Sequence, residues 1–497
     1  MVYQSAQKLL DYALHNSLIS PVDIYFVRNQ LMEALQLTDW EERVSDFSPD
    51  EAIDDILLPL VDYACEKGII ADTSNSRDLF DTKLMGIFTP MPREIAFAFS
   101  RIRNFNPNQA TDWYYDFSKK VNYVRAGRIA KDLKWVYSCE YGDLDITINC
   151  SKPEKDPRDI AAAKTAKAAT YPKCQLCAEN AGFAGHANHP ARQNLRPVPI
   201  IVNKEEWQLQ YSPYGYYNEH CIAFNTKHIP MVIDKEVFGK MFDIIDYLPH
   251  YFVGSNADLP IVGGSILSHE HFQGGNYSFA MAKSDVETQF VLKDYPDVNA
   301  GIVKWPLSVI RVSSTNRESL EKCCAHILNK WRNYSDEKAG IFAETDGVPH
   351  NTITPISRMN NGEYECDLVL RNNITTEERP LGVFHPNPKL HHIKKENIGL
   401  IEVMGLAVLP ARLAKEIPLM ENALLNKDYN SSEPALASHL EWLKELGEKY
   451  PDINKDNVRN IIEQEIGKVF SLVLEDAGVY KRNAQGKEAF LRFISSL

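Results

Sequence analysis

The hydrophobic pattern changes its period near residue 134, and this change constrains the fold more than any other feature of the chain. Before it, apolar residues at 24–35 recur at helical spacing behind Ser20-Pro21, a serine cap followed by a proline at the first helical position. After it, residues 135–148 alternate apolar and polar side chains on either side of a Tyr141-Gly142-Asp143 turn, which is typical of a hairpin. The chain is therefore expected to begin with helices and to continue as a mixed α+β fold.

Two later segments contain the same kinds of element. Residues 171–290 combine short strands with one amphipathic helix near 234–250. The next segment has a strand at 307–312, a helix that ends at Trp331, and a hairpin signal at Asn360-Asn361-Gly362. This repetition indicates a duplicated α+β unit.

These patterns predict three parts. A helical extension occupies 1–130, a first α+β unit 131–290, and a second unit 291–497 that ends in helices from Asn397 onward. A Lys/Ala-rich connector at 151–170 lies within the first unit. A chain of 497 residues has room for about two to four domains, each with its own core.

The charge balance excludes some partners. With 54 Lys and Arg against 67 Asp and Glu, the formal net charge is −13, which argues against binding to nucleic acid or to an anionic membrane. The N-terminus has no signal-peptide pattern, and no apolar run approaches the roughly 18 residues of a membrane span. Nine scattered cysteines are typical of a reducing compartment. We therefore expect a cytoplasmic protein.

The stretch 263–275, Gly-Gly-Ser-Ile-Leu-Ser-His-Glu-His-Phe-Gln-Gly-Gly, is the first candidate site. His269 and His271 are two residues apart, so they point to the same face of an extended strand. The flanking glycines allow backbone N–H groups to approach a phosphate closely, and Ser265 and Gln273 add neutral donors.

A histidine in such a strand can act as a nucleophile. A neutral imidazole, with an ordinary pKa of ~6.5, that donates Nδ1–H to a backbone carbonyl keeps Nε2 free to attack the α-phosphorus of a nucleoside diphosphate sugar. The alternative is that both histidines are metal ligands or hydrogen-bonding residues of the core. Glu270, between them, either points to solvent or helps to orient an imidazole.

Cys174-Gln175-Leu176-Cys177 is a second candidate site. Such a pair forms a redox couple, two unrelated core cysteines, or half of a tetrahedral zinc site. Because the chain has no second Cys-x-x-Cys, other metal ligands must be histidines or carboxylates. His228 and His269 are the candidates, with His220 as an alternative.

The stretch 263–275 resembles the histidine-triad motif of the galactose-1-phosphate uridylyltransferases, in the looser spacing of their second, bacterial type. The resemblance implies that His271 is the nucleophile, that Gln273 and Ser265 bind phosphate, and that Asn256 and Gly263 lie near the nucleotide. It also implies a structural zinc site with four ligands: Cys174, Cys177, His228 and His269.

The stretch from His385 to Gly405 resembles the family's C-terminal, hexose-binding element. By that match Glu402 binds sugar hydroxyls, with Asn397 and Lys395 nearby; the alternative is a solvated basic turn before an ordinary helix. Arg358 and Arg371 are either phosphate contacts or surface charges.

First-type relatives carry a second metal site made by one glutamate and three histidines. Glu287 and His350 stand at plausible positions for two of these ligands. The expected His-x-His is Leu368-Val369-Leu370, so we predict that this site is absent or incomplete.

The resemblance implies a ping-pong exchange of the uridylyl group between glucose 1-phosphate and galactose 1-phosphate, with UDP-glucose and UDP-galactose as the nucleotide substrates. It also implies duplicated histidine-triad-like units with antiparallel sheets, a homodimer, and no organic cofactor. Two alternatives are a related nucleotidyltransferase or hydrolase that uses the same histidine, and a zinc-stabilised binding module without enzymatic activity.

Overall fold

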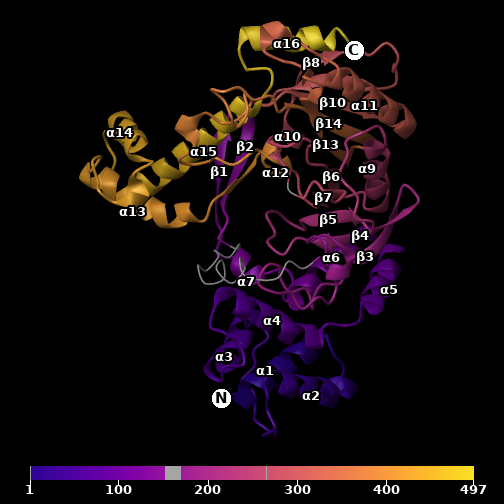
Figure 1. Cartoon of the computed structure of the whole chain (residues 1–497), viewed down its shortest axis with the longest axis vertical. Helices are drawn as coiled ribbons and strands as arrows, with labels where there is room; N and C mark the ends of the chain where they lie inside the picture. Colours follow the sequence, from indigo (N-terminus) through magenta and orange to yellow (C-terminus); the bar gives the residue numbers. More distant parts are fainter. Residues whose placement is uncertain (1, 151–169, 265) are drawn as a thin grey trace. The chain divides into compact units, whose positions relative to one another are not determined.

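The computed structural model describes residues 2–150, 170–264 and 266–497 (Figure 1). All but the last residue of the predicted connector, and Ser265, lie outside the described residues. The chain divides into two compact units, which we describe separately. The first unit comprises Met1–Lys131, Ser151–Pro230 and Ser268–His271, and the second unit comprises Asp132–Cys150, Met231–Leu267 and Phe272–Leu497.

The first unit begins with helices, as the sequence predicted. Their apolar faces supply a core that includes Leu9, Leu31 and Leu60. The predicted start at Ser20 is a single 3-10 turn, in which the Ser20 backbone N–H donates to the Asp23 carboxylate at 2.8 Å. The helices are α1 (Val2–His15), α2 (Ile24–Ala34), α3 (Ile53–Glu66), α4 (Ser74–Phe88), α5 (Pro92–Arg103), α6 (Pro107–Lys120) and α7 (Ala126–Ile129).

An antiparallel sheet completes the first unit. Its strands are β3 (Val198–Val202), β4 (Glu205–Tyr211) and β5 (Cys221–Asn225). Helix α6 is tied to this sheet because the buried Tyr211 hydroxyl donates to the Thr111 carbonyl at 2.9 Å. The helical N-terminal residues therefore form one unit with the strands that precede the histidine motif.

The second unit contains a longer antiparallel sheet with the order β7-β6-β13-β14-β10-β9-β8. Helices α9 (Glu236–Tyr247) and α11 (Arg317–Arg332) pack against it (Figure 1). The predicted hairpin at 360–362 joins β13 to β14, with left-handed backbone at Asn361 and Gly362. The strands are β6 (Phe252–Gly254), β7 (His271–Gly275), β8 (Val286–Phe290), β9 (Asn299–Val303), β10 (Val309–Ser314), β13 (Asn351–Asn360) and β14 (Glu363–Asn372).

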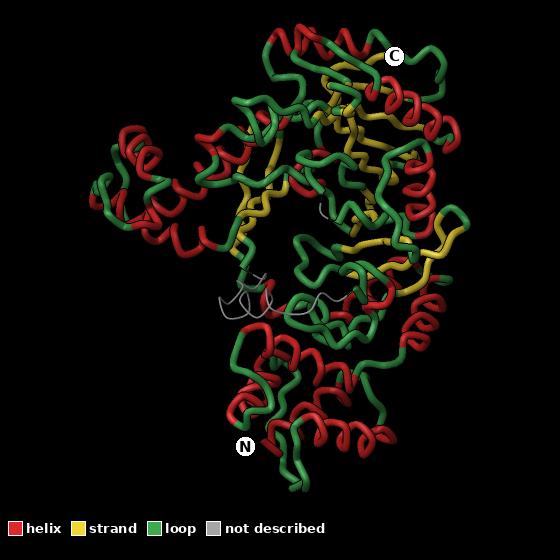
Figure 2. The backbone as a smooth tube through the Cα atoms, viewed as in Figure 1, coloured by secondary structure: helices red, strands yellow, loops and turns green. Residues whose placement is uncertain are grey.

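A three-stranded sheet lies beside the C-terminal helices (Figure 2). The predicted hairpin forms β1 (Leu133–Cys139) and β2 (Gly142–Ile148). Strand β15 (Leu406–Leu409) pairs in parallel with β2, in a segment that the sequence analysis assigned to helix. Four apolar residues in a row do not distinguish helix from strand, and the pairing with residues 145–148 decided the outcome.

The remaining elements of the second unit are mostly helical. They are α10 (Ala280–Lys283), α12 (Leu400–Val403), α13 (Arg412–Asn426), α14 (Leu440–Lys449), α15 (Val458–Ala477) and α16 (Ala484–Ile494), with the two short strands β11 (Glu344–Thr345) and β12 (Val348–Pro349). The α+β class with antiparallel sheets between N-terminal and C-terminal helices is thus confirmed. The duplication and the three-part division at 130 and 290 stay predictions. In the described part of the chain, no helix is long and apolar enough to cross a membrane.

Candidate active site and metal centre

The predicted zinc ligands come together in the first unit. One ligand atom from each of Cys174, Cys177, His228 and His269 lies within 4.8 Å of all the others. The Nδ1 atom of His269 is 3.1 Å from the Cys174 sulfur, and Nδ1 of His228 is 3.2 Å from the Cys177 sulfur. A zinc ion with bonds of about 2.0–2.3 Å separates its ligand atoms by about 3.3–3.8 Å, so this cluster could hold a metal ion.

Two further features suit a metal. The Nε2 atom of His269 lies 2.7 Å from the Asn225 carbonyl oxygen, so Nε2–H donates there and the Nδ1 lone pair is left for the cluster. Burial raises the pKa of the Cys174 thiol to about 11, so a nearby cation is needed to hold it as a thiolate at neutral pH. His220, the alternative ligand, packs its ring against Tyr216 and Tyr217 instead.

Asn180 stabilises the cysteine turn, a role that its position in the sequence did not indicate. Its side-chain amide donates to the carbonyl oxygens of Cys174 and Cys177, at 2.8 Å each. Its own oxygen lies 2.6 Å from Nε2 of His189, whose N–H donates to it. The position of an asparagine three residues after Cys177 was the available signal, but such a residue has no distinctive spacing.

His271 has the orientation required of a nucleophile. The side chain is 4% exposed, and its Nδ1 atom lies 2.7 Å from the His269 carbonyl oxygen. Nδ1–H therefore donates to this carbonyl, which leaves the lone pair on Nε2. Burial lowers the pKa of His271, so the ring is neutral near pH 7.

Glu270 faces the protein interior, so the solvent-facing alternative is wrong. The Asn225 side-chain amide donates to its carboxylate at 2.9 Å, and the Asn225 backbone N–H donates to its carbonyl at 3.0 Å. Because the Asn225 carbonyl receives the His269 N–H, Glu270 acts on the imidazole of His269 through Asn225. Asn225 was also missed, since an asparagine at the end of a strand is not diagnostic.

In the second unit, the structure brings Asn256 and Gly263 to the turn that carries Glu402. The Asn256 side-chain oxygen accepts the Leu400 backbone N–H at 3.0 Å, and the Glu402 carboxylate accepts the Gly399 N–H at 2.9 Å. A Cβ atom at Gly263 would lie 2.6 Å from the Ile398 carbonyl oxygen. Gly263 thus permits the close approach of two backbone segments.

The remaining predicted substrate residues differ in their surroundings. Lys395 and Asn397 are exposed, whereas the buried Lys394 forms the ion pair with Glu402. Gln273 is half-buried in β7, opposite Gly254 of β6. The predicted roles of these side chains stay predictions, and Ser265 lies outside the described residues.

Replacing Gly263 by alanine is expected to lower the free energy of unfolding by roughly 2–5 kcal/mol. The new Cβ would lie 2.6 Å from the Ile398 carbonyl oxygen and 2.8 Å from the Gly399 Cα atom. In addition, the backbone of Gly263 itself is left-handed, with φ of +94°, which an alanine rarely adopts. Gly340→Ala is the control, because its φ is +68° but no atom lies within 4 Å of the added methyl group. Denaturant unfolding should show a loss of only about 1 kcal/mol in the control. Equal losses in both variants would contradict the steric explanation.

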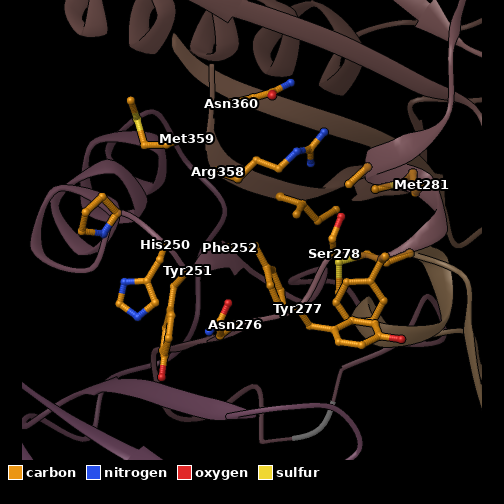
Figure 3. A pocket seen from close by; sticks show the side chains of 15 residues that line it. His250, Tyr251, Phe252, Asn276, Tyr277, Ser278, Met281, Arg358, Met359 and Asn360 are labelled. Carbon is orange, nitrogen blue, oxygen red and sulfur yellow. The ribbon is translucent and has the colours of Figure 1, made fainter. Parts of the chain in front are cut away.

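Arg358 lines a cavity of about 280 Å³ in the second unit, together with residues 249–252, 276–279 and 281–282 (Figure 3). Its guanidinium donates to the Asp367 carboxylate at 2.9 Å and also pairs with Glu365, so its charge is already balanced. The described residues predicted for substrate binding do not line this cavity.

The positions considered for a second metal site have other partners. Arg482 donates to both Glu287 carboxylate oxygens, at 2.7 and 2.8 Å. The ring of His350 lies 2.9 Å from the side-chain oxygens of Asn373 and Thr345. Leu368 is fully buried in β14.

Two family models match most of the chain. The model described as galactose-1-phosphate uridyl transferase, N-terminal domain, matches residues 18–230, and the C-terminal domain of the same family matches residues 244–444. Proteins named galactose-1-phosphate uridylyltransferase are similar over the whole length. Those of Fusobacterium nucleatum and Clostridium acetobutylicum are each 52% identical, covering 99% and 100% of this chain and 98% and 100% of their own. That of Bacillus subtilis is 49% identical, covering 100% of this chain and 98% of its own.

These matches define the chain as a nucleotidyltransferase, the class of enzyme predicted from the sequence. It belongs to the galactose-1-phosphate uridylyltransferase family. Among solved structures, the crystal structure of yeast Ap4A phosphorylase matches with a TM-score of 0.37 and 10% identity, covering 65% of this chain and 95% of that one. A likeness at this TM-score carries no argument about the site.

Proposed function

We propose that this protein exchanges a uridylyl group between glucose 1-phosphate and galactose 1-phosphate through a covalent uridylyl-histidine on His271. The supporting observation is the hydrogen bond from His271 Nδ1 to the His269 carbonyl, which leaves Nε2 as the nucleophile. Membership of the family supports the identity of the substrates.

In the first step, the Nε2 lone pair attacks the α-phosphorus of UDP-glucose. A nitrogen–phosphorus bond forms, the bond from phosphorus to the bridging oxygen breaks, and its electron pair leaves with glucose 1-phosphate. In the second step, a phosphate oxygen of galactose 1-phosphate attacks the same phosphorus and the bond to Nε2 breaks, which releases UDP-galactose. The carbonyl that accepts Nδ1–H stabilises the positive charge on the ring while Nε2 is bonded to phosphorus.

In this proposal the other predicted site residues bind the substrates and take no part in bond formation or cleavage. Gln273 and Ser265 donate to phosphoryl oxygens, and Asn256 and Gly263 lie along the nucleotide. Glu402 accepts hydrogen bonds from hexose hydroxyls, with Lys395 and Asn397 at the edge of that subsite.

Zinc is the metal that we propose for the Cys₂His₂ cluster. Two thiolates and two imidazoles would supply four protein ligands, the closed donor set that is typical of a structural zinc site. The ion would stabilise the turn at Cys174 and the strand residue His269. Because His271 follows two residues later, a fixed His269 also supports the nucleophile.

We further propose a cytoplasmic homodimer that binds neither nucleic acid nor membrane. The charge of −13 supports the exclusion of nucleic acid and anionic membranes. The cytoplasmic location and the dimer rest on the cysteine usage and on the family, respectively.

Intact-protein mass spectrometry after incubation with UDP-glucose tests the covalent step. The wild type is expected to gain the mass of one uridylyl group, and His271→Gly to gain none. If neither protein gains mass while sugar nucleotide is turned over, double displacement is wrong and a direct transfer replaces it. If nothing is turned over, the protein is a binding module.

A second measurement separates a transferase from a hydrolase with the same intermediate. The wild type is expected to exchange labelled glucose 1-phosphate into UDP-glucose. Hydrolysis of UDP-glucose without exchange would show that water discharges the uridylyl-histidine.

A further inference from the structure

Arg371 is a buried arginine whose hydrogen bonds, in the part of the chain that the structure describes, go to neutral acceptors. Its side chain is 2% exposed within β14. The guanidinium donates to the Ile398 carbonyl oxygen at 2.8 Å and to the Thr354 hydroxyl at 3.3 Å, both neutral acceptors. No ion pair joins Arg371 to a carboxylate among the residues that the structure describes. Burial lowers its pKa to about 10, although the charge of Glu402 acts in the opposite direction.

The arginines in neighbouring strands behave differently. Arg311 in β10 and Arg358 in β13 both donate to the Asp367 carboxylate, at distances of 2.7–2.9 Å. A buried charge normally has such a partner, because removing an ion from water without one is strongly unfavourable. Among the described residues, the hydrogen bonds of Arg371 go to neutral oxygens, and the nearby charge of Glu402 offsets part of this cost without an ion pair. The contact with Ile398 therefore needs a reason beyond the packing of the sheet.

The Ile398 carbonyl marks the start of the turn that leads to Glu402. Beyond it, Gly399 N–H is capped by the Glu402 carboxylate and Leu400 N–H is held by Asn256. Lys394 pairs with the other Glu402 oxygen. Arg371 supplies the hydrogen bond that this turn receives from β14. The direction of the Glu402 side chain thus depends on where the Ile398 carbonyl is held.

We propose that Arg371 is a positioning residue, which holds the Ile398–Glu402 turn so that Glu402 meets the hexose. This inference rests on the proposed role of Glu402 in binding the sugar. An arginine suits the task because its planar fork reaches the hydroxyl and the carbonyl at once. Arg371 need not touch the substrate.

Arg371→Met in the full chain tests the proposal by separating binding from stability. The KM for galactose 1-phosphate is expected to rise at least tenfold. The melting temperature should stay the same or rise, because an apolar side chain of similar length removes an unpaired buried charge. Arg371→Gln, which retains a donor for the Ile398 carbonyl, should recover most of the loss in KM.

Arg311→Met is the matched control. It leaves Asp367 and Glu365 with one cation fewer, so the melting temperature should fall while the KM for galactose 1-phosphate stays within about twofold. A KM within twofold of wild type in Arg371→Met would overturn the positioning role. So would a fall in melting temperature at unchanged KM, because that result assigns Arg371 to folding alone. If Arg371→Met fails to fold, Arg371→Leu decides, because it also removes the donor to the Ile398 carbonyl. A KM raised at least tenfold at a near wild-type melting temperature supports the positioning role, and a KM within twofold of wild type overturns it.

Failure of the proposed function gives a different result. If the wild type itself neither gains a uridylyl group nor exchanges glucose 1-phosphate, the transferase proposal is wrong, whatever the variants do. If the wild type does both and Arg371→Met has the wild-type KM, only the inference about Arg371 is wrong.

Discussion

A His271→Asn variant is expected to lose at least ~10⁴-fold in kcat/KM for the formation of UDP-galactose. The asparagine amide can still donate to the His269 carbonyl, so it replaces the hydrogen bond that His271 Nδ1–H makes at this buried position. What it lacks is the Nε2 lone pair, and without a nucleophile the two-step path is closed. A coupled assay for UDP-galactose measures the loss.

His326→Asn is the control for this prediction. His326 is a half-buried histidine of α11 with no proposed role in the site, so its replacement should leave kcat/KM within a few-fold of wild type. A His271→Asn variant that keeps more than about one-tenth of wild-type activity would show that another group carries the uridylyl unit.

Loss of the metal is the second large expected effect, and it acts on stability. Replacing Cys174 by serine removes one ligand of the cluster, so we expect the variant to bind less than one zinc per chain. The free energy of unfolding should fall by at least ~3 kcal/mol, which corresponds to roughly 6–12 °C in melting temperature. Elemental analysis and thermal unfolding measure the two quantities. A strong chelator should shift the wild type in the same direction.

Cys65→Ser is the matched control, since Cys65 is another half-buried free cysteine of the first unit but lies in α3, outside the cluster. It should retain one zinc per chain and a near wild-type melting temperature. If Cys174→Ser and Cys65→Ser have the same metal content and stability, the cluster consists of unmetallated side chains.

Much of the fold could be predicted because local patterns agreed with it. Helix-start residues and helical spacing correctly predicted the N-terminal helices, and the turn residues at 141–143 and 360–362 correctly predicted two hairpins. Strand β15 was missed because its four apolar residues have no period of their own. Its partner β2 lies more than 250 residues earlier in the chain, so only long-range pairing makes it a strand.

In the candidate site too, the sequence predicted what local patterns carry and missed what depends on long-range contacts. The sequence led directly to the histidine pair and to Cys174 and Cys177, because chemistry-bearing residues were concentrated within a few positions. It did not reveal Asn180, which donates hydrogen bonds to the carbonyls of both cysteines, or Asn225, whose carbonyl accepts the hydrogen bond of His269. Asparagine is common at turns and strand ends, so nothing in its position indicated this role.

By itself, the sequence determined which chemistry this protein can perform: an imidazole in a glycine-flanked strand and a pair of thiols close to one another along the chain. Only the tertiary structure decided which residues complete each group. It placed His228 rather than His220 beside the Cys177 thiol, 51 residues earlier in the chain, and it placed Lys394 rather than Lys395 in the ion pair with Glu402. The physical reason is that hydrogen bonds and metal ligands require atoms within about 2–4 Å of one another. The sequence spacing of two residues determines the distance between their atoms only when the residues are a few positions apart. For residues that are far apart in the sequence, tertiary packing determines that distance.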